Sequence, residues 1–524
     1  MGSNQISGGW FSTPHLALED RIRFADSSLS GVAITTTTLF GCGLFALASW
    51  LLLFHPLAGI PGPILGRLSP VYMYVVSYLG VEGRLLRHLH EKFQAKVVRV
   101  GPGSVSISDS AAIRDIYVSG GGFLKDARYS NFNLGPVVTI FSSLDNGYRD
   151  QRAKAVAPLF SPARLRNASR QDGAIGQCIK TFVRQFEDFK AASSRVDILD
   201  LSARLAMDAT TLYLLGQAYG GLTEHAHLPV AERRNMHLSA NPFIAAIVRF
   251  GRFSLLPQRL FKLAYSLSSL LSANKEVTKS AVQLDDFVQR VVQETFLKSV
   301  KEREGIYQAR LVNAGISPGE AAAQAKAVMF AGADSIAVMM ATIMFHIAQN
   351  PRVRKNLEHE SQECRRTADG DLASSRPYLR AVVREGLRLG MTNPTRMTRV
   401  VPAPGLRVGN IFLPPGTTVG CSPAVLHHDP DVFPEPFIFR PERWLDAEES
   451  QGLRQPNMER SLIPYGVGLR ACLGKNLAQQ LLHDTIASVV ESGVLGGAKT
   501  CQERIELIEW FNAEIKGHKL ELEW

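Results

Sequence analysis

A long apolar segment between Ser317 and Asn350 limits the possible folds of this chain more than any other feature. A capping serine, then proline at the first helical position and glutamate at the third, opens the segment, and Asn350-Pro351 closes it. A helix of this length spans roughly 50 Å, enough to cross a whole domain. Because its middle, VMFAGADSIAVMMATIMF, is apolar on nearly every side, this helix is expected to be buried.

The middle of the helix carries two polar residues, Asp334 and Ser335, shortly after Gly332. A carboxylate and a hydroxyl inside a buried helix need a reason, and two interpretations remain open at this point. In one, Ser335 bonds back to a carbonyl one turn earlier and Asp334 pairs with a basic side chain. In the other, Gly332 opens a notch over a bound ligand, where Asp334 and Ser335 relay protons.

The composition limits what this chain can be. With 524 residues, 45% hydrophobic and 20% charged, it can bury the core of one large domain or of about three ordinary ones. The six cysteines lie far apart without a C-x-x-C pair, which argues against structural zinc and a disulfide framework and favours a reducing compartment. The net charge of +10 suggests acidic partners or an anionic membrane surface. No basic run is interleaved with aromatic residues, so no nucleic-acid partner is expected.

Most of the remaining chain has helical periodicity. A short hairpin is expected where the alternating segments 96–100 and 104–108 flank a Gly-Pro-Gly turn. Residues 220–275 have no clear pattern and are assigned to helices and a mobile connection. The predicted fold class is therefore mainly α with small β-sheets (α+β).

A second apolar segment, Gly31–Phe54, is free of charged residues and about long enough to cross a bilayer as a helix. We interpret it as a transmembrane anchor; a cleaved signal peptide is the alternative, but Arg21 and Arg23 lie well upstream and no cleavage site is evident. Basic residues are more numerous after the span than before it, which places the body in the cytosol and residues 1–30 in the lumen. Three prolines make residues 55–66 a semi-rigid hinge.

One cysteine, Cys472, lies in a glycine-rich loop just before a segment, KNLAQQLLHDTIASVV, that is expected to begin a helix. Glycines allow backbone amides to approach a sulfur or a flat cofactor closely. Near Arg470 and a helix N-terminus the thiol should ionise readily, giving a nucleophile or a soft metal ligand. An inert core cysteine is the alternative. Haem iron is a metal that a single cysteine can hold, because the porphyrin supplies the equatorial ligands.

The loop around this cysteine resembles the haem-binding signature of the cytochrome P-450 monooxygenases. The match reads Tyr465-x-x-Gly468-x-Arg470-x-Cys472-x-Gly474, with tyrosine where the family usually has phenylalanine. Further segments resemble other signatures of this family, in the family's order: Tyr148-x-x-x-Arg152 for W-x-x-x-R, Ala331-Gly332-Ala333-Asp334-Ser335 for the oxygen-activation motif, Glu385-Gly-Leu-Arg388 for E-x-x-R, and Pro441-Glu442-Arg443-Trp444 for the segment whose arginine completes that ion network. The anchor and hinge match microsomal, particularly fungal, members.

The resemblance implies that residues 67–524 form a haem-thiolate monooxygenase domain of the cytochrome P-450 fold, with the long helix over a haem b. Cys472 would be the axial thiolate ligand of the iron. Asp334 and Ser335 would deliver protons at Gly332; serine keeps the hydroxyl of the family's usual threonine but lacks its methyl. The other implied positions are the propionate partners Arg470, Arg152 and Arg399, the haem-contacting Tyr148, Tyr465, Gly468 and Gly474, the buried ion network Glu385, Arg388 and Arg443, and the pocket residues Phe330 and Met329. A surface position for Arg399 and simple packing for Tyr148 are the alternatives.

The reaction implied is insertion of one atom of dioxygen into an apolar small molecule, by hydroxylation or epoxidation, in fungal secondary metabolism such as terpenoid or polyketide biosynthesis. Electrons would come from NADPH through a membrane-bound NADPH–cytochrome P-450 reductase, with cytochrome b5 as a further candidate donor. Lys475 and Arg149 are candidates for the basic docking face. The expected location is the endoplasmic reticulum membrane, where the apolar substrate enters from the lipid.

Two other functions remain open at this stage. A haem-thiolate isomerase or dehydratase consumes a hydroperoxide and needs no reductase, but the intact pair Asp334 and Ser335 counts against it. A catalytically idle membrane-bound haem protein is the second alternative. Turnover with NADPH, reductase and oxygen separates the three.

Overall fold

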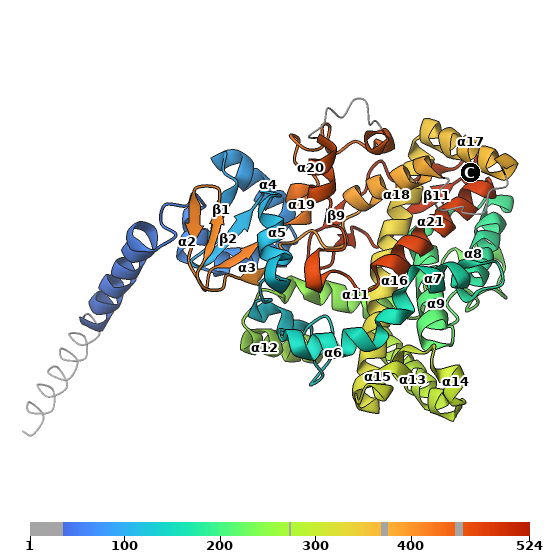
Figure 1. Ribbon diagram of the computed structural model, residues 1–524, viewed down its shortest axis with the longest axis horizontal. Coiled ribbons are helices and arrows are strands. Elements are labelled where there is room, and N and C mark those ends of the chain that lie inside the picture. The colour runs from blue at the N-terminus through green and yellow to red at the C-terminus, as the bar shows by residue number, and fades with distance from the viewer. Residues whose placement is uncertain (1–34, 272–273, 368–375, 446–453) are drawn as a thin grey trace, which may run out of the picture. The chain divides into compact units, whose positions relative to one another are not determined.

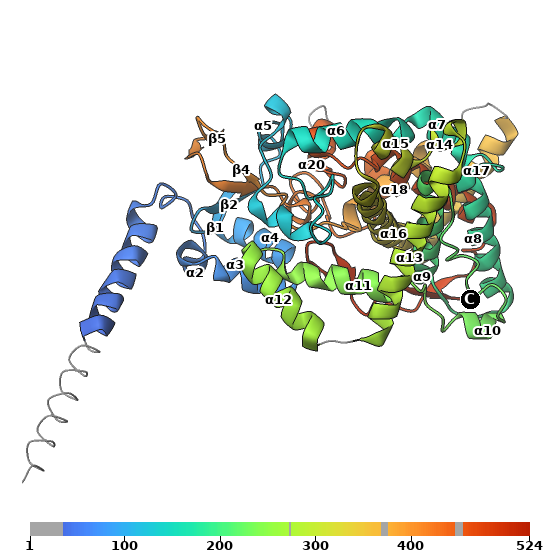
Figure 2. The same ribbon diagram turned by 90° about the horizontal axis from the view of Figure 1, so that it is seen from below.

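The long helix expected from the sequence is the central element of the helical body. In the computed structural model it is α16 (Pro318–Gln349), which runs through the body in Figure 1 and is seen nearly end-on in Figure 2. The Ser317 hydroxyl accepts a hydrogen bond from the backbone N–H of Glu320, so the first turn is capped as predicted. The prediction of this helix and of both its ends is confirmed.

Several other helices of the larger unit pack against α16 (Figure 2). They come from widely separated parts of the chain, and each buries an apolar face against it. They are α9 (Ile198–Leu215), α13 (Lys275–Leu297), α15 (Tyr307–Asn313), α17 (Pro351–Thr367), α18 (Pro377–Leu389) and α21 (Lys475–Glu491).

The remaining helices do not pack closely along α16, and α10, α11 and α12 occupy the stretch whose sequence pattern was unclear. The α-helices are α2 (Ile64–Leu68), α3 (Val71–Leu79), α4 (Glu82–Phe93), α5 (Ala112–Tyr117), α6 (Asn146–Val156), α7 (Pro162–Ser169), α8 (Ala174–Ala191), α10 (Val230–Arg233), α11 (Asn241–Phe250), α12 (Gln258–Leu271), α14 (Val300–Arg303), α19 (Pro423–Leu426) and α20 (Arg454–Ser461). Short 3₁₀ turns are η2 (Ser119–Gly121), η3 (Ala127–Phe132), η4 (Ala157–Phe160), η5 (Gly251–Phe253), η6 (Pro441–Trp444) and η7 (Gly468–Arg470).

A four-stranded sheet lies at the opposite end of the body from α8 and α17 (Figure 1). Its strands β1 (Val97–Gly101) and β2 (Ser104–Ile107) form the predicted antiparallel hairpin. β7 (Thr418–Gly420) pairs with β2 in parallel, and β4 (Arg399–Val400) pairs with β7 in the antiparallel sense. The sheet therefore joins two segments of the chain that are distant in sequence.

Smaller antiparallel sheets complete the fold, which is mainly helical as predicted. They consist of β3 (Val196–Asp197), β11 (Glu521–Glu523) and β8 (Lys499–Thr500); of β5 (Leu406–Val408) and β6 (Ile411–Leu413); and of β9 (Leu507–Ile508) and β10 (Glu514–Ile515). The connection between β9 and β10 reaches α16 and enters the candidate site.

The structure describes residues 35–271, 274–367, 376–445 and 454–524. Within this part, the apolar segment near the N-terminus is helical over Thr35–Phe54 and has the length and hydropathy of a membrane span, with only 6% of its most apolar window buried. α16 has a similar hydropathy, but 72% of its window is buried, so it is a core helix. The expected lumenal residues 1–30 and the start of the anchor at residues 31–34 lie outside the described residues.

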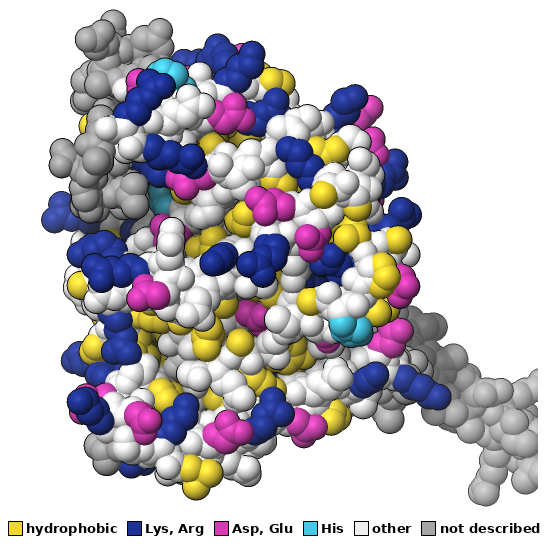
Figure 3. Space-filling view, turned by 90° about the vertical axis from the view of Figure 1, so that its right-hand side faces the viewer, with side chains coloured by type: hydrophobic (Ala, Val, Ile, Leu, Met, Phe, Trp, Pro, Cys, Tyr) yellow, Lys and Arg dark blue, Asp and Glu magenta, His cyan; other side chains and the backbone are white. Residues whose placement is uncertain are grey.

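The chain divides into two compact units, residues 1–59 and 60–524. Residues 60–66, expected as part of the hinge, thus belong to the larger unit, where the Pro61 carbonyl accepts a hydrogen bond from the Arg99 backbone. On the face of this unit around α8 and α17, acidic side chains lie between the basic ones (Figure 3). Charges of both signs are therefore mixed on this face.

Candidate active site

Cys472 lies in a tight loop between α20 and α21. Its backbone N–H donates to the Tyr465 carbonyl at 2.8 Å. Gly468 has a φ of +73°, and a Cβ atom there would lie 1.8 Å from the Tyr117 carbonyl oxygen. Only glycine fits so close to α5, and this contact fixes the path of the chain into Cys472.

The Cys472 side chain has an exposed surface although protein atoms surround it. Burial raises the pKa of its thiol, which the Gly474 backbone N–H and the Lys475 charge only partly oppose. Arg470 is instead bound to the Ser143 carbonyl at 2.9 Å. The expectation that this arginine makes the thiol ionise readily is therefore not met by the protein alone, and a cation bound to the sulfur would supply the missing stabilisation of a thiolate.

Glu385, Arg388 and Arg443 meet in one buried ion network. Arg388 donates from Nη2 and Nε to the two Glu385 oxygens at 2.7 and 3.0 Å, and Arg443 Nε donates to Glu385 at 3.0 Å. The Trp444 indole N–H also donates to Glu385, at 3.0 Å, a contact that no sequence pattern indicated. Glu385 and Arg388 are completely buried, so removing one partner would strand a charge in the interior.

His427 links this network to the cysteine loop. Its Nδ1 lies 3.1 Å from the Arg388 carbonyl, and its Nε2 accepts the Ile463 backbone N–H at 3.0 Å, which places the ring proton on Nδ1. Burial lowers the pKa of this imidazole to about 3, so it remains a neutral acceptor. No motif predicts this role, because only the fold brings the three residues together.

Four cations gather in and around the loop: Arg470 and Arg399, both expected, and Lys125 and Arg149. Burial lowers the pKa of Lys125 well below its usual range, and the charges of the three arginines lower it further. Arg399 is only 4% exposed, which excludes a surface position. Among the described residues, only Arg149 of the four has an ion-pair partner, Asp150. The cluster therefore favours a ligand with carboxylate groups.

Arg152, one turn after Arg149 on α6, lies against the first turn of α16. Its Nε and Nη2 bind the two carboxylate oxygens of Glu320, and the Tyr148 hydroxyl lies 2.8 Å from the same carboxylate. Burial and the Glu320 contact raise the pKa of Tyr148 to about 12. Because Glu320 already neutralises Arg152, this geometry gives no support to the roles expected for Tyr148 and Arg152 towards propionates.

The middle of α16 has exposed surface at Ala331, and Asp334 and Ser335 are half-buried. Asp334 accepts a hydrogen bond from the Asn512 side chain at 3.2 Å. Burial raises the pKa of the Asp334 carboxyl to about 6, although this hydrogen bond lowers it. Asn512 belongs to the β9–β10 connection, and no sequence pattern indicated that it would reach α16.

Gly332 faces α9. A Cβ atom at this position would lie 2.6 Å from the Thr210 Oγ1 and 2.9 Å from its Cγ2, so glycine allows the two helices to pack closely. Thr210 thus occupies the notch that was expected at Gly332. The exposed position on this part of α16 is Ala331 instead.

The two expected pocket residues differ in their surroundings. Met329 is fully buried in the main core, whereas Phe330 is half-buried and its ring centroid lies 5.5 Å from that of Phe243 on α11. A further aromatic cluster, which the sequence did not indicate, surrounds Phe511, the residue before Asn512. Its members are Tyr129, Phe132 and Phe141, with ring centroids 5.9, 4.2 and 5.8 Å from that of Phe511.

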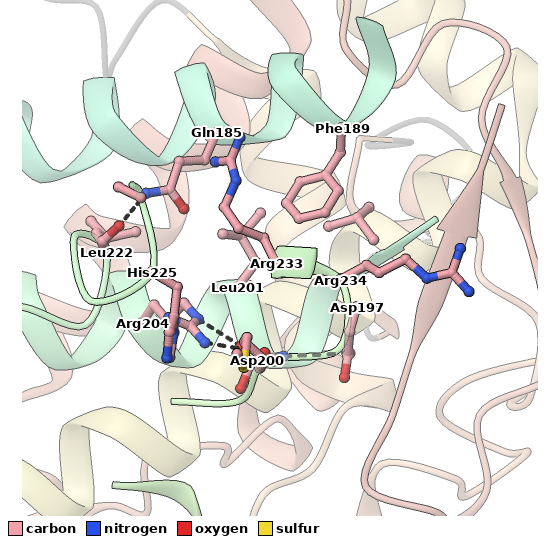
Figure 4. Close-up of a pocket in the computed structure, with 13 residues that line it drawn as sticks. Gln185, Phe189, Asp197, Asp200, Leu201, Arg204, Leu222, His225, Arg233 and Arg234 are labelled. Atoms are coloured by element: carbon pink, nitrogen blue, oxygen red, sulfur yellow. Dashed lines mark hydrogen bonds and ion pairs between the residues drawn. The ribbon is translucent and has the colours of Figure 1, made fainter. Parts of the chain in front are cut away.

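A separate polar recess lies beside α8 and α9 and shares no residue with the site above (Figure 4). Within it, Arg204 donates to Asp200 at 2.6 Å and to the Gly221 carbonyl at 2.9 Å. Its volume of about 30 Å³ suits a water molecule, far below the roughly 300 Å³ of small-molecule pockets. We therefore infer that the contacts of Arg204 in this recess hold the chain after α9 in place.

These residues fit a haem on three observations. The Cys472 sulfur is reachable inside the protein, Ala331 is exposed in the middle of a mostly buried helix, and the cation cluster lacks carboxylate partners for three of its four members within the described ranges. Those ranges contain no group of three or more His, Cys, Asp or Glu side chains that could hold a bare metal ion. A single thiolate suits a metal whose other ligands come from a porphyrin.

Comparisons with known proteins agree with this geometry. The family model described as cytochrome P-450 matches residues 66–492. The cytochrome P-450 monooxygenase mfmF of Annulohypoxylon moriforme is 59% identical over 479 residues, which cover 90% of this chain and 96% of the relative. The fusicoccadiene C-8 hydroxylase of Alternaria brassicicola is 27% identical over an alignment that covers 83% of this chain and 84% of the relative. The pisatin demethylase of Fusarium vanettenii is also 27% identical, with 84% of each chain covered.

The family match extends over most of the chain, from residue 66 to just past the end of α21, and includes the cysteine loop, the ion network and the middle of α16. The chain belongs to the cytochrome P-450 family of oxidoreductases.

Proposed function

We propose that this protein inserts one oxygen atom from dioxygen into an apolar small molecule, by hydroxylation or epoxidation, in fungal secondary metabolism. The observation that carries the proposal is the reachable Cys472 thiol, in a loop braced by a buried ion network, in a chain of this family. One fungal relative is named as a hydroxylase of fusicoccadiene, which supports an apolar substrate.

Cys472 holds the iron of a haem b through its sulfur, and Arg470 and Arg399 neutralise the propionates, together with Lys125 and Arg149. A haem bound in this way supplies activation of dioxygen and transfer of one oxygen atom. The Glu385 network and His427 keep the cysteine loop in position.

Asp334 and Ser335 deliver protons to the reacting oxygen. With a pKa raised to about 6, Asp334 exchanges protons near neutral pH, and its hydrogen bond to Asn512 holds the carboxylate in place. The Ser335 hydroxyl passes the proton on and, without the methyl of threonine, does so from a less restricted rotamer. The Phe330 side chain, which is only half-buried on α16, packs against the substrate.

Electrons come from NADPH through a membrane-bound flavoprotein reductase, with cytochrome b5 as a candidate second donor. The Thr35–Phe54 helix anchors the protein in the endoplasmic reticulum membrane, with the larger unit in the cytosol. Exposed Lys475, directly after the cysteine loop, contributes to the docking face for the reductase. Arg149 does not contribute to this face, because its side chain is only 11% exposed.

The test is spectroscopic. In the reduced protein with carbon monoxide, the Soret band should move to the long wavelength characteristic of thiolate-ligated haem, and Cys472→Ala should abolish that band. Oxidation of an apolar compound should then require NADPH, reductase and oxygen together. Product formation without reductase would favour the isomerase or dehydratase, and a band that survives Cys472→Ala would refute the ligand assignment.

A further inference from the structure

Arg128, in η3, is a buried cation whose charge has no carboxylate partner among the described residues. The residue is 7% exposed, and its Nη2 donates to the Thr395 hydroxyl at 3.2 Å. Its Nε and Nη1 have no hydrogen-bond partner within the described part of the chain. Buried charged donors rarely lack hydrogen-bond acceptors in folded proteins. We therefore expect a group with acceptor atoms to bind to these N–H groups.

Aromatic rings surround this guanidinium. Its carbon lies 5.1 Å from the ring centroid of Phe511 and 5.7 Å from that of Tyr129. Such contacts stabilise the charge over the ring faces, but they leave N–H groups in the plane of the guanidinium unpaired. Both edges that can receive a carboxylate, Nε with Nη2 and Nη1 with Nη2, keep an unpaired N–H.

The contacts of Arg128 connect it to the proposed reaction site through the segment that contains Phe511 and Asn512. Phe511 directly precedes Asn512, whose side chain binds Asp334 on α16. Thr395, the hydrogen-bond partner of Arg128, lies in the segment between α18 and β4. Arg128 therefore contacts the aromatic cluster around Phe511, and Phe511 is the residue before the hydrogen-bond partner of Asp334.

We propose that Arg128 binds the carboxylate of a substrate that is otherwise apolar. This inference rests on the proposed function and narrows its substrate class to carboxylic acids. The carboxylate bonds to the guanidinium edges, while Thr395 holds Nη2 and is itself hydrogen-bonded to Asn393 at 3.3 Å. A haem propionate is a second possible source of the carboxylate. Arg399, a proposed propionate partner, also contacts the Tyr129 ring, so a propionate could lie near Arg128. The experiment distinguishes the two sources.

The experiment measures substrate-induced spin-state shifts of the full-length, haem-loaded protein. The probes are three acid–amide pairs: dodecanoic acid, an abietane diterpenoid acid and 4-phenylbutanoic acid, each with its primary amide. We expect at least one acid to bind about 10- to 100-fold more tightly than its amide at neutral pH. Arg128→Gln should abolish this preference and leave the amide affinity unchanged, whereas Arg128→Lys, which keeps the charge without the fork, should retain part of it.

Two readouts distinguish the sources of the carboxylate. Arg407→Gln, at an exposed position on β5, is the matched control and should keep the acid preference. If Arg128→Gln lowers haem content and leaves the preference intact, the carboxylate is a propionate and the substrate assignment is overturned. The assignment is equally overturned if no acid binds more tightly than its amide in the unaltered protein.

A failure of this inference differs from a failure of the proposed function. In the first case the protein keeps the carbon monoxide band and oxidises neutral compounds with NADPH and reductase, but without preference for acids. In the second case the band itself is missing, and the acid–amide comparison shows no spin-state shift at all.

Discussion

Asp334 has a proton affinity that an exposed aspartate does not have. Burial raises the pKa of its carboxyl group from 3.8 to about 6; the Asn512 hydrogen bond and His518 lower it, and Glu514 raises it further. A carboxyl group with this pKa is partly protonated near neutral pH, which a group that passes protons requires. The same shift has a measurable effect on stability.

Asp334→Asn should change the pH dependence of unfolding. Because the folded pKa is higher than the unfolded one, the folded protein binds more protons between pH 4 and 6, and its stability falls as the pH rises through this window. The variant lacks this loss. The difference in unfolding free energy between variant and parent should therefore shift by about 2–3 kcal/mol in favour of the variant from pH 4 to pH 7. Urea unfolding at both pH values checks this, with the exposed Asp431→Asn as the control. An equal difference at both pH values would contradict the assignment.

Contacts between residues that are close in sequence could be predicted from local motifs. Glu385 and Arg388 are one helical turn apart on α18, so their pairing follows from spacing alone. Asn512 and His427 carry no such signal, because their partners on α16 and in the cysteine loop are distant in sequence. Arg152 belongs to a local motif, but the motif did not indicate its partner Glu320. Which acid a long side chain reaches depends on how the helices pack.

Among the helices, the packing of α9 against α16 depends on one glycine. Gly332 lets Thr210 approach the α16 backbone, and the Thr210 hydroxyl is buried there without a hydrogen-bond partner among the described residues. The close approach holds the middle of α16, with Asp334 and Ser335, at a fixed distance from α9. Any side chain at position 332 must separate the two helices or displace Thr210.

Gly332→Ala should therefore destabilise the protein by about 1–3 kcal/mol, despite the higher helix propensity of alanine. Gly319→Ala in the same helix is the matched control, because a Cβ atom there meets no neighbour within 4 Å. Adding Thr210→Ala should recover part of the loss by removing the two atoms in closest contact. Chemical denaturation measures all three. A double variant as unstable as Gly332→Ala would disprove the contact as the cause.

Elements with local start and stop signals could be predicted from the sequence. Ser317 and Asn350 define α16, and the segment after Gly474 begins α21 as expected. Strands such as β4 and β8 contain only two residues each and exist because distant strands pair with them. No periodicity can develop over two residues, so such strands were beyond prediction.

Across the larger unit, the Glu385 network joins α18 to η6 and, through His427, to the cysteine loop. Arg443→Met should cost about 3–5 kcal/mol, because it leaves part of the buried Glu385 charge uncompensated. Arg440→Met, three residues earlier, should cost at most about 1 kcal/mol, since Arg440 is 39% exposed and its ion pair with Glu435 is solvated. Thermal unfolding compares the two, and similar losses would argue against a structural role for the network.

Deleting residues 1–59 tests the division into two units. The remaining chain, from Ile60, contains the candidate site, so it should fold, bind haem and give the same carbon monoxide band as the full-length protein. Only the full-length protein should stay in the membrane fraction after an alkaline wash, because it keeps the apolar helix. Loss of the band on truncation would show that the smaller unit contributes to folding of the larger one.

The parallel pairing of β2 with β7 delays completion of the sheet during synthesis on the ribosome. Ser104 lies opposite Thr418, so the hairpin at the start of the sheet must wait while about 300 further residues are added, roughly 15 to 60 s at usual translation speeds. During this interval the edge of β2 offers unpaired N–H and C=O groups to other nascent chains. Newly made copies should therefore depend on chaperones until the last fifth of the polypeptide emerges.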